Sequence, residues 1–235
     1  MKAPPFEYRA PRDLDEALEE LSRHGDEAKI LAGGQSLVPA MNLRLAAPRV
    51  IVDINRIGDL DGVEVGSQEI RVGALVRHAR FDRERGRDGL WRLLSSISHH
   101  VGHLPIRLRG TFCGSLAHAD PAAEWCTAAL ALDARVIASG ARGSRTIDAR
   151  DFFDSAFTTA LAPDEILTEV RLPLLGDAAG VGFAEVSRTA GDFALVASLA
   201  VLRVEGGRIA EARIGLAGVE ARPVRAGRAE DALVG

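Results

Sequence analysis

Apolar residues in the N-terminal part of the chain alternate between the spacing of helices and the short runs of strands. Leu14, Leu18 and Leu21 recur at helical spacing after Asp13, a residue type that caps helix N-termini. The pattern predicts a strand at 6–9, a helix from Asp13 to near Gly25, a strand at 29–32, a helix at 38–44 and a strand at 50–54. This order of elements is typical of a compact α/β lobe.

A second lobe is predicted from about residue 58, where hairpins and helices are mixed. Asp120 and Pro121 have the residue types of an N-cap and a first-turn proline, and Pro173 ends the last strand. The predicted elements are a hairpin at 63–65 and 69–72, helices at 76–85, 89–101 and 122–132, a hairpin at 134–138 and 144–147, an amphipathic stretch at 151–160 and a strand at 166–172.

Residues 174–180 break the periodicity with small residues and two glycines, which is typical of a linker. Beyond it, three long strands and the beginning of a helix are predicted, at 182–188, 193–204, 208–217 and 226–234. The strands favour an antiparallel meander. We therefore expect two domains: residues 1–173, with lobes of about 1–57 and 58–173, and residues 180–235.

Two glycine-bearing turns are the candidate binding elements. The first, at 29–37, runs from an apolar stretch through Gly33 and Gly34 into the helix at 38–44, and the second lies at 111–115. Paired glycines let successive N–H groups point into one concavity, which suits an anion such as a diphosphate. The alternative is an ordinary tight turn. Neither turn fits the Walker or the Rossmann pattern.

Composition and charge narrow the class of protein. The 235 residues are 47% hydrophobic and 26% charged, which is typical of a globular protein. A net charge of −4 and sparse aromatic residues argue against nucleic-acid binding. The sequence shows no apolar run of transmembrane length and no signal-peptide pattern at its start, so we expect a cytoplasmic protein.

The cysteine and histidine content predicts no metal site on this chain. Cys113 and Cys126 are too few to hold an iron–sulfur cluster, so cluster or metal chemistry would belong to a partner chain. His99, His100 and His103 have a spacing that fits the end of a helix better than a closed metal site.

Five stretches, of which the first two contain the glycine turns, occur in order along nearly the whole chain: LAGGQSL at 31–37, IRLRGTFCGS at 106–115, ADPAAE at 119–124, EILTEVRLP at 165–173 and RTAGDFALV at 188–196. With them the chain resembles the FAD-binding medium subunit of the molybdenum hydroxylases, the family of aerobic carbon monoxide dehydrogenases and xanthine dehydrogenases. The resemblance implies an α+β fold, in which a two-lobed FAD-binding domain of the PCMH type precedes a sheet-plus-helix domain of the CO dehydrogenase flavoprotein type. We expect this C-terminal domain to be shortened, since the family's domain continues past the position of Gly235.

The resemblance also implies the contacts of the FAD, which would extend between the lobes. They are Lys29, Leu31, Ala32, Gly33, Gly34, Gln35, Ser36 and Leu37 in the first turn, Thr111, Cys113, Gly114 and Ser115 in the second, and Asp120, Leu167, Asp192 and Phe193 beyond them. Three of these have an alternative role from the residues alone: Asp120 as a helix cap, and Leu167 and Phe193 as core residues.

Several positions depart from the family pattern. Cys113 stands where the family has a glycine, and a positive φ there would strain the backbone by about 1 kcal/mol. Leu108 replaces an expected Asn, and Ala184 and Glu185 lie where a Lys is common.

By the resemblance, the chain is a redox flavoprotein without a catalytic acid or base. A molybdenum-cofactor large subunit would oxidise the substrate, and a [2Fe-2S] small subunit would pass the electrons to this FAD. They would then leave to an external acceptor, NAD or a quinone. Two alternatives are a stand-alone FAD-dependent oxidoreductase on the same scaffold, and a degenerate interaction subunit that has lost the flavin.

Overall fold

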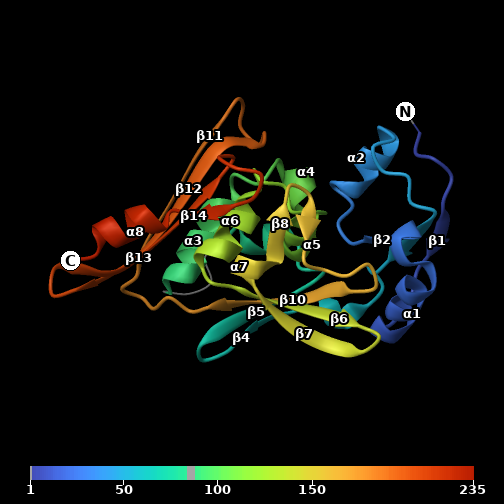
Figure 1. Ribbon diagram of the computed structural model, residues 1–235, viewed down its shortest axis with the longest axis horizontal. Coiled ribbons are helices and arrows are strands. Elements are labelled where there is room, and N and C mark those ends of the chain that lie inside the picture. The colour runs from blue at the N-terminus through green and yellow to red at the C-terminus, as the bar shows by residue number, and fades with distance from the viewer. Residues whose placement is uncertain (1, 84–87) are drawn as a thin grey trace.

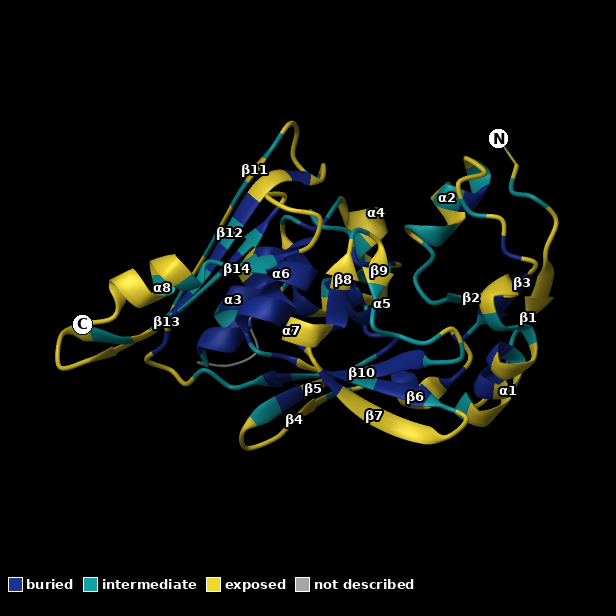
Figure 2. Ribbon diagram, viewed as in Figure 1, coloured by how far each residue is buried: buried dark blue, intermediate teal, exposed yellow. Residues whose placement is uncertain are grey.

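The computed structural model describes residues 2–83 and 88–235, and its elements form three parts (Figure 1). The first lobe, in blue, and the C-terminal sheet, in orange and red, lie at opposite ends, with the second lobe between them. Figure 2 shows that the middle of the molecule holds a dense group of buried helices and strands. The α+β fold predicted from the sequence is confirmed.

The first lobe is a three-stranded parallel sheet with one long helix against it. Its elements are β1 (Glu7–Arg9), α1 (Leu14–His24), a 3₁₀ turn (Gly25–Glu27), β2 (Ala28–Leu31), α2 (Leu37–Asn42), β3 (Val50–Asp53) and a 3₁₀ turn (Gly58–Leu60). The Asp13 carboxylate caps α1 by accepting the Glu16 N–H at 2.9 Å, and α1 buries Leu18 and Leu21. The strand order is β1-β3-β2, and the predicted order of elements is confirmed.

The second lobe is a five-stranded antiparallel sheet, ordered β4-β5-β10-β6-β7, with helices over it. Its strands are β4 (Val63–Val65), β5 (Glu69–Gly73), β6 (Arg135–Gly140), β7 (Gly143–Asp148) and β10 (Ile166–Pro173), with a small hairpin of β8 (Phe153–Ser155) and β9 (Thr158–Thr159). Its helices are a 3₁₀ turn (His78–Phe81), α3 (Gly89–Ser98), α4 (Leu104–Arg107), α5 (Phe112–His118), α6 (Glu124–Ala131) and α7 (Ala149–Phe152).

Aromatic side chains fill the core of the second lobe. The Trp125 ring lies 5.0 Å from the Phe112 ring and 5.5 Å from the Phe81 ring, measured between centroids. The Trp125 Nε1–H donates to His78 Nδ1 at 3.0 Å, so the indole nitrogen is satisfied although it is buried. Burial, helped by two nearby arginines, lowers the pKa of His78 to about 4, so this imidazole is neutral at physiological pH.

The C-terminal part is an antiparallel sheet, ordered β11-β12-β13-β14, with one helix at its edge. Its elements are β11 (Gly180–Ser187), β12 (Ala194–Glu205), β13 (Arg208–Ala217), β14 (Val224–Arg225) and α8 (Gly227–Leu233), as the meander predicted. β13 packs closely on α6 at Gly215, where a Cβ would lie 2.9 Å from Thr127 Cγ2 and 3.0 Å from the Ala131 Cβ. The preceding linker is fixed by the Asp88 carboxylate, which accepts the Gly176 N–H at 2.7 Å.

Two predicted helices of the second lobe differ in the structure. Among the described residues of the helix predicted at 76–85, a 3₁₀ turn forms at 78–81 in its place, because the His78 N–H donates to the Gly110 carbonyl at 3.0 Å. Residues 84 and 85 of that prediction lie outside the described residues. The helix predicted at 122–132 begins at Glu124, because the Asp120 carboxylate accepts the Ala122 N–H at 2.9 Å within a turn. The helix-cap role for Asp120 is therefore wrong.

Two other segments also differ from the prediction. The amphipathic stretch predicted at 151–160 becomes the end of α7 and the β8–β9 hairpin. The short helix α4 was not predicted, because its Leu-Pro-Ile-Arg sequence has no distinctive helical period over one turn.

Glu124 makes the stability of this fold depend on pH. Burial raises the pKa of Glu124 from 4.5 to about 7, and repulsion from Glu185 and Asp120 acts in the same direction. The folded chain then binds a proton more tightly than the unfolded chain, so the free energy of unfolding falls as the pH rises from 4.5 to 7. The Glu124→Gln variant should lose this dependence and be more stable above pH 7 by roughly 3 kcal/mol.

Denaturant unfolding at several pH values between 4 and 8 measures the effect. The exposed Glu64, in β4, supplies the matched control Glu64→Gln, which should follow the wild type. Parallel curves for Glu124→Gln and the wild type would contradict the prediction.

Candidate functional site

A cleft of about 630 Å³ lies where the first lobe meets the second. β2 and β3 are parallel neighbours, so their carboxyl ends lie at one edge of the sheet, where ligands commonly bind. The chain leaves β2 at the first glycine turn and β3 at Asp53. The residues that line the cleft are Leu31, Ala32, Gly33, Gly34, Gln35, Val38, Pro39, Asp53, Asn55, Arg77, Leu108 and Arg109.

The first glycine turn lies directly against the second lobe. A Cβ on Gly33 would lie 2.6 Å from the Arg109 carbonyl oxygen and 2.9 Å from the Thr111 nitrogen, so no side chain fits there. Gly34 follows with φ of +72°, a conformation that favours glycine. Within the described part of the chain, the N–H groups of Gly33 and Gly34 donate to no protein acceptor. These amides can therefore serve an anion in the cleft.

The second glycine segment is the first turn of α5 rather than an open turn. The Thr111 hydroxyl caps α5 by accepting the Gly114 N–H at 3.1 Å. A Cβ on Gly114 would lie 2.5 Å from Thr111 Oγ1, so a side chain there would displace the capping hydroxyl. Ser115, half-buried, follows in the same turn. The start of α5 therefore lies just behind Arg109, which lines the cleft, whereas residues 110–115 are not among the lining residues.

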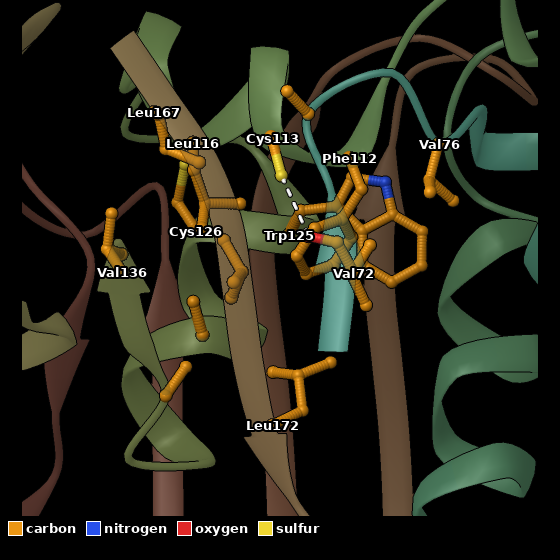
Figure 3. Close-up of a cluster of buried hydrophobic side chains, with 14 of the residues drawn as sticks. Val72, Val76, Phe112, Cys113, Leu116, Trp125, Cys126, Val136, Leu167 and Leu172 are labelled. Carbon is orange, nitrogen blue, oxygen red and sulfur yellow. Dashed lines mark hydrogen bonds between the residues drawn. The ribbon is translucent and has the colours of Figure 1, made fainter. Parts of the chain in front are cut away.

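Cys113 is a helical residue whose thiol points into the core (Figure 3). Its Sγ lies 3.4 Å from the Gly73 carbonyl oxygen and 3.5 Å from that of Val72. Burial, together with the charge of Glu169, raises the pKa of this thiol. The residue is not among those with positive φ, so the strain expected at this position is wrong. A helical backbone accepts any L-residue here, which explains how a thiol replaces the family's glycine.

A carboxylate and an amide form the other wall of the cleft. The Asp53 carboxylate accepts the Tyr8 hydroxyl at 2.6 Å and the Asn55 Nδ2–H at 2.6 Å. Burial raises the pKa of Asp53, but these hydrogen bonds outweigh it and the pKa is lowered overall. Across the cleft, the Arg77 guanidinium donates to Asn55 Oδ1 at 2.6 Å.

The structure brings five of the predicted contacts together in the cleft, at 31–35, and sets Thr111 against them. Lys29 is exposed in the middle of β2, and Ser36 and Leu37 begin α2. None of these three lines the cleft.

The remaining predicted contacts lie away from this cleft. Asp120 is half-buried in the turn before α6, and Leu167 is a buried residue of β10 beside Leu116 and Cys126 (Figure 3). Asp192 is exposed and accepts the N–H of Phe193, whose side chain is 61% exposed. Phe193 is therefore not a core residue in this structure.

Several residues of the cleft were missed by the sequence prediction. Asp53 and Asn55 could have been found, because they follow a buried strand that a parallel sheet would place beside the glycine turn. Leu108, 55% exposed, was noted only as a departure from the family. Arg109 lies within the family stretch at 106–115 but was not singled out. Arg77 carries no sequence signal, since only the packing of the two lobes brings it to the cleft.

The other departures noted in the sequence lie at the seam between α3, α6 and β11. Ala184 is exposed, whereas the Glu185 side chain is only 2% exposed and its Oε1 lies 4.0 Å from His100 Nδ1. Burial raises the pKa of Glu185.

The histidines of 99–103 make structural contacts. His99 Nδ1 lies 2.7 Å from the Ser95 carbonyl oxygen, and the His100 ring packs edge-on against Phe183. The described residues contain no group of three or more His, Cys, Asp or Glu side chains arranged to hold a metal ion. Nor do they include a helix of the length and hydropathy needed to span a membrane.

Comparison with known proteins identifies the class. A family model described as the FAD binding domain in molybdopterin dehydrogenase matches residues 4–175, and a model of the CO dehydrogenase flavoprotein C-terminal domain matches residues 182–235. The residues that line the glycine cleft all lie within the part of the chain that the FAD-binding model matches.

Individual relatives agree with the family models. The chain is 39% identical over 235 residues to the 6-hydroxypseudooxynicotine dehydrogenase complex subunit alpha of Paenarthrobacter nicotinovorans, covering 100% of this chain and 79% of the relative. It is 35% identical to the carbon monoxide dehydrogenase medium chain of Afipia carboxidovorans, covering 98% and 80%. The structure of carbon monoxide dehydrogenase from Hydrogenophaga pseudoflava superposes with a TM-score of 0.96 at 34% identity, covering 100% and 82%.

The chain belongs to the FAD-binding medium subunits of the molybdenum hydroxylase family, and its cofactor is FAD. It is an FAD-dependent oxidoreductase subunit, as the resemblance implied.

The helical setting of Cys113 predicts the effect of replacing it. In Cys113→Gly, a helix-interior glycine and the loss of a buried side chain should together lower the free energy of unfolding by about 2 kcal/mol. Cys113→Ala keeps the helix propensity and should lose about half of that. Denaturant unfolding of the three proteins measures both changes. A glycine variant as stable as the wild type would show that the thiol has no packing role.

Proposed function

We propose that this chain binds FAD across the cleft and passes electrons through it within a molybdenum hydroxylase complex. The observation that supports this best is the backbone of Gly33 and Gly34, whose N–H groups have no acceptor among the described residues and which packs against residues 109–111, just before α5. Backbone amides that are free in this way suit the diphosphate of FAD. Gln35, which lines the same wall, adds a side-chain amide.

The further contacts implied by the resemblance complete the proposed binding surface. Lys29, Ser36 and Leu37 would belong to the diphosphate turn. Thr111, Cys113, Gly114 and Ser115 would hold the cofactor from α5, with Cys113 acting through its backbone because its thiol is buried. Asp120, Leu167, Asp192 and Phe193 would lie toward the flavin ring, where the second lobe meets the C-terminal sheet.

When bound, the flavin supplies the electron chemistry, and the chain supplies position and electrostatics. The Gly33–Gly34 amides bind the diphosphate, and the buried neutral His78 keeps the segment that carries Arg77 in place. No side chain needs to act as a general acid or base in this role.

The proposed partners follow from the relatives, which are a complex subunit and medium chains of dehydrogenases. They are a molybdenum-cofactor large subunit, where a substrate is oxidised, and a [2Fe-2S] small subunit that delivers the electrons. NAD or a quinone would then accept the electrons from the flavin. We propose that the complex acts in the cytoplasm.

Two other functions use the same fold. A stand-alone FAD-dependent oxidoreductase would bind FAD and turn over without partner subunits, and a degenerate interaction subunit would bind no flavin. The absorbance spectrum of the purified chain, with the released cofactor identified as FAD or FMN, separates the last from the others. Co-purification with molybdenum and iron–sulfur subunits supports the complex, and a flavin-free chain that FAD does not reconstitute would refute our proposal.

Substitution at the glycine turn tests the binding site itself. Gly33→Val should abolish FAD retention, because its Cβ would lie 2.6 Å from backbone atoms of the second lobe and would force the lobes apart. Gly62→Val is the matched control, since a Cβ there meets nothing within 4 Å. The measurement is flavin content per chain, with far-UV circular dichroism as the check on folding. Normal flavin content in Gly33→Val would rule out this turn as the binding element.

A further inference from the structure

A continuous chain of hydrogen bonds crosses the cleft between the two glycine segments. On the first lobe, Asn55 Nδ2 donates to the Ala32 carbonyl at 2.7 Å, immediately before Gly33. Asn55 Oδ1 accepts from Arg77 Nη2 at 2.6 Å, and Arg77 Nη1 donates to the carbonyl of Arg109 on the second lobe. This series of hydrogen bonds therefore begins and ends beside the point where Gly33 meets the second lobe.

The Arg77 end of this series of hydrogen bonds is anchored in the aromatic core of the second lobe. The Arg77 backbone forms an isolated β-bridge with Thr111, the residue that caps α5. The next residue, His78, donates its N–H to the Gly110 carbonyl at 3.0 Å, and its ring accepts from Trp125. Gly110 in turn leaves no space for a Cβ, which would lie 2.6 Å from His78 Nε2. The position of the guanidinium is thus set by the aromatic core.

The Asn55 end is fixed on the first lobe in a similar way. Asn55 Nδ2 also donates to Asp53 Oδ1 at 2.6 Å, and the Asn55 N–H donates to the same oxygen at 2.9 Å. Tyr8, from β1, holds the other oxygen of Asp53. All three strands of the first lobe therefore meet at the amide that receives Arg77.

We infer that Asn55 and Arg77 form an inter-lobe strut, which sets the separation of the Gly33 turn from the Arg109 side of the cleft and so controls capture of the FAD diphosphate. The inference rests on the proposed function. Arg77 is a positioning residue in this reading: two of its N–H donors are committed to protein acceptors rather than to a ligand. Asn55 is exposed and Arg77 is half-buried, so the strut contributes little to the stability of the fold.

The alternative role for Arg77 is direct attraction of the diphosphate by its charge, and two substitutions separate the roles. Asn55→Ala breaks the strut and leaves every positive charge of the cleft in place. Arg77→Lys keeps the charge, but a single ammonium group does not reproduce the fork that spans two acceptors. The matched control is Arg145→Met on β7, which removes an arginine bound to Glu165 and to the Ala160 carbonyl, away from the cleft.

The experiment measures the FAD dissociation constant of the full chain by flavin fluorescence. Asn55→Ala, Arg77→Met and Arg77→Lys should each weaken binding about tenfold, the weight of one charge-assisted hydrogen bond. The Asn55→Ala/Arg77→Met double variant should bind no more weakly than either single variant, since both remove the same link. Arg145→Met should bind like the wild type.

Wild-type affinity in Asn55→Ala, restored affinity in Arg77→Lys, or additive losses in the double variant would each overturn the strut. Hydrogen exchange of the FAD-free chain tests the strut without the cofactor. Amides at 33–37 should exchange faster in Asn55→Ala than in the wild type, whereas those of β3 should not change. If the wild-type chain binds no FAD but the amides at 33–37 exchange faster in Asn55→Ala, the proposed function is refuted, whereas the link between the lobes through Asn55 and Arg77 is supported. Unchanged exchange at 33–37 would refute the strut even in a chain that binds FAD.

Discussion

The close approach of two backbones, at Gly33 and at 109–111, is the constraint on which the rest of the site depends. A Cβ on Gly33 would lie 2.6 Å from the Arg109 carbonyl oxygen, so the two lobes can meet only where the side chain is absent. This contact places the first glycine turn against residues 109–111, immediately before α5. The position of the cleft follows from that contact, and the Asn55–Arg77 hydrogen bond links the two lobes beside it.

The aromatic core of the second lobe fixes the position of Arg77, on one side of the cleft. The ring of Trp125 packs against Phe81 and Phe112 and donates to His78, and the aromatic group is buried beneath α5 and the 3₁₀ turn. His78 is neutral and stays buried in this core, where its ring accepts a hydrogen bond from Trp125. The neighbouring Arg77 therefore leaves the core at a defined place. The position of a half-buried guanidinium is thereby determined by apolar packing several residues away.

The seam with the C-terminal sheet is formed differently. Part of it is close packing: β13 lies against α6 where Gly215 leaves no space, and Phe183 packs on His100. Glu185 is poorly matched, since its Oε2 is buried without a hydrogen-bond partner among the described residues, and Glu124 is close enough to repel it. Elsewhere the Arg225 guanidinium, on β14, donates to Asp133 of the second lobe at 3.1 Å, so ion pairing and close packing together join the C-terminal sheet to the FAD-binding domain.

The sequence by itself determined the elements with strong local signals. The capped helix α1, the succession of elements in the first lobe, the hairpins of β4 with β5 and of β6 with β7, and the C-terminal meander all carry hydrophobic periods or turn residues that need no long-range information. The motifs around Gly33 and Gly114 also placed the chain in its family. Where local signals compete with long-range ones the prediction failed, as at 76–85, where the backbone of His78 bonds to Gly110 instead of forming a helix.

Only the tertiary structure decided which residues face the cleft. Asn55 and Arg77 are 22 positions apart and have no motif in common, yet they share a hydrogen bond because the two lobes close on Gly33. Likewise, the backbone conformation of Cys113 could not be derived from its neighbours, since the capping bond from Gly114 to Thr111 makes the segment helical and turns the thiol inward. Side-chain types set the local elements, whereas the site depends on contacts between segments that no local pattern encodes.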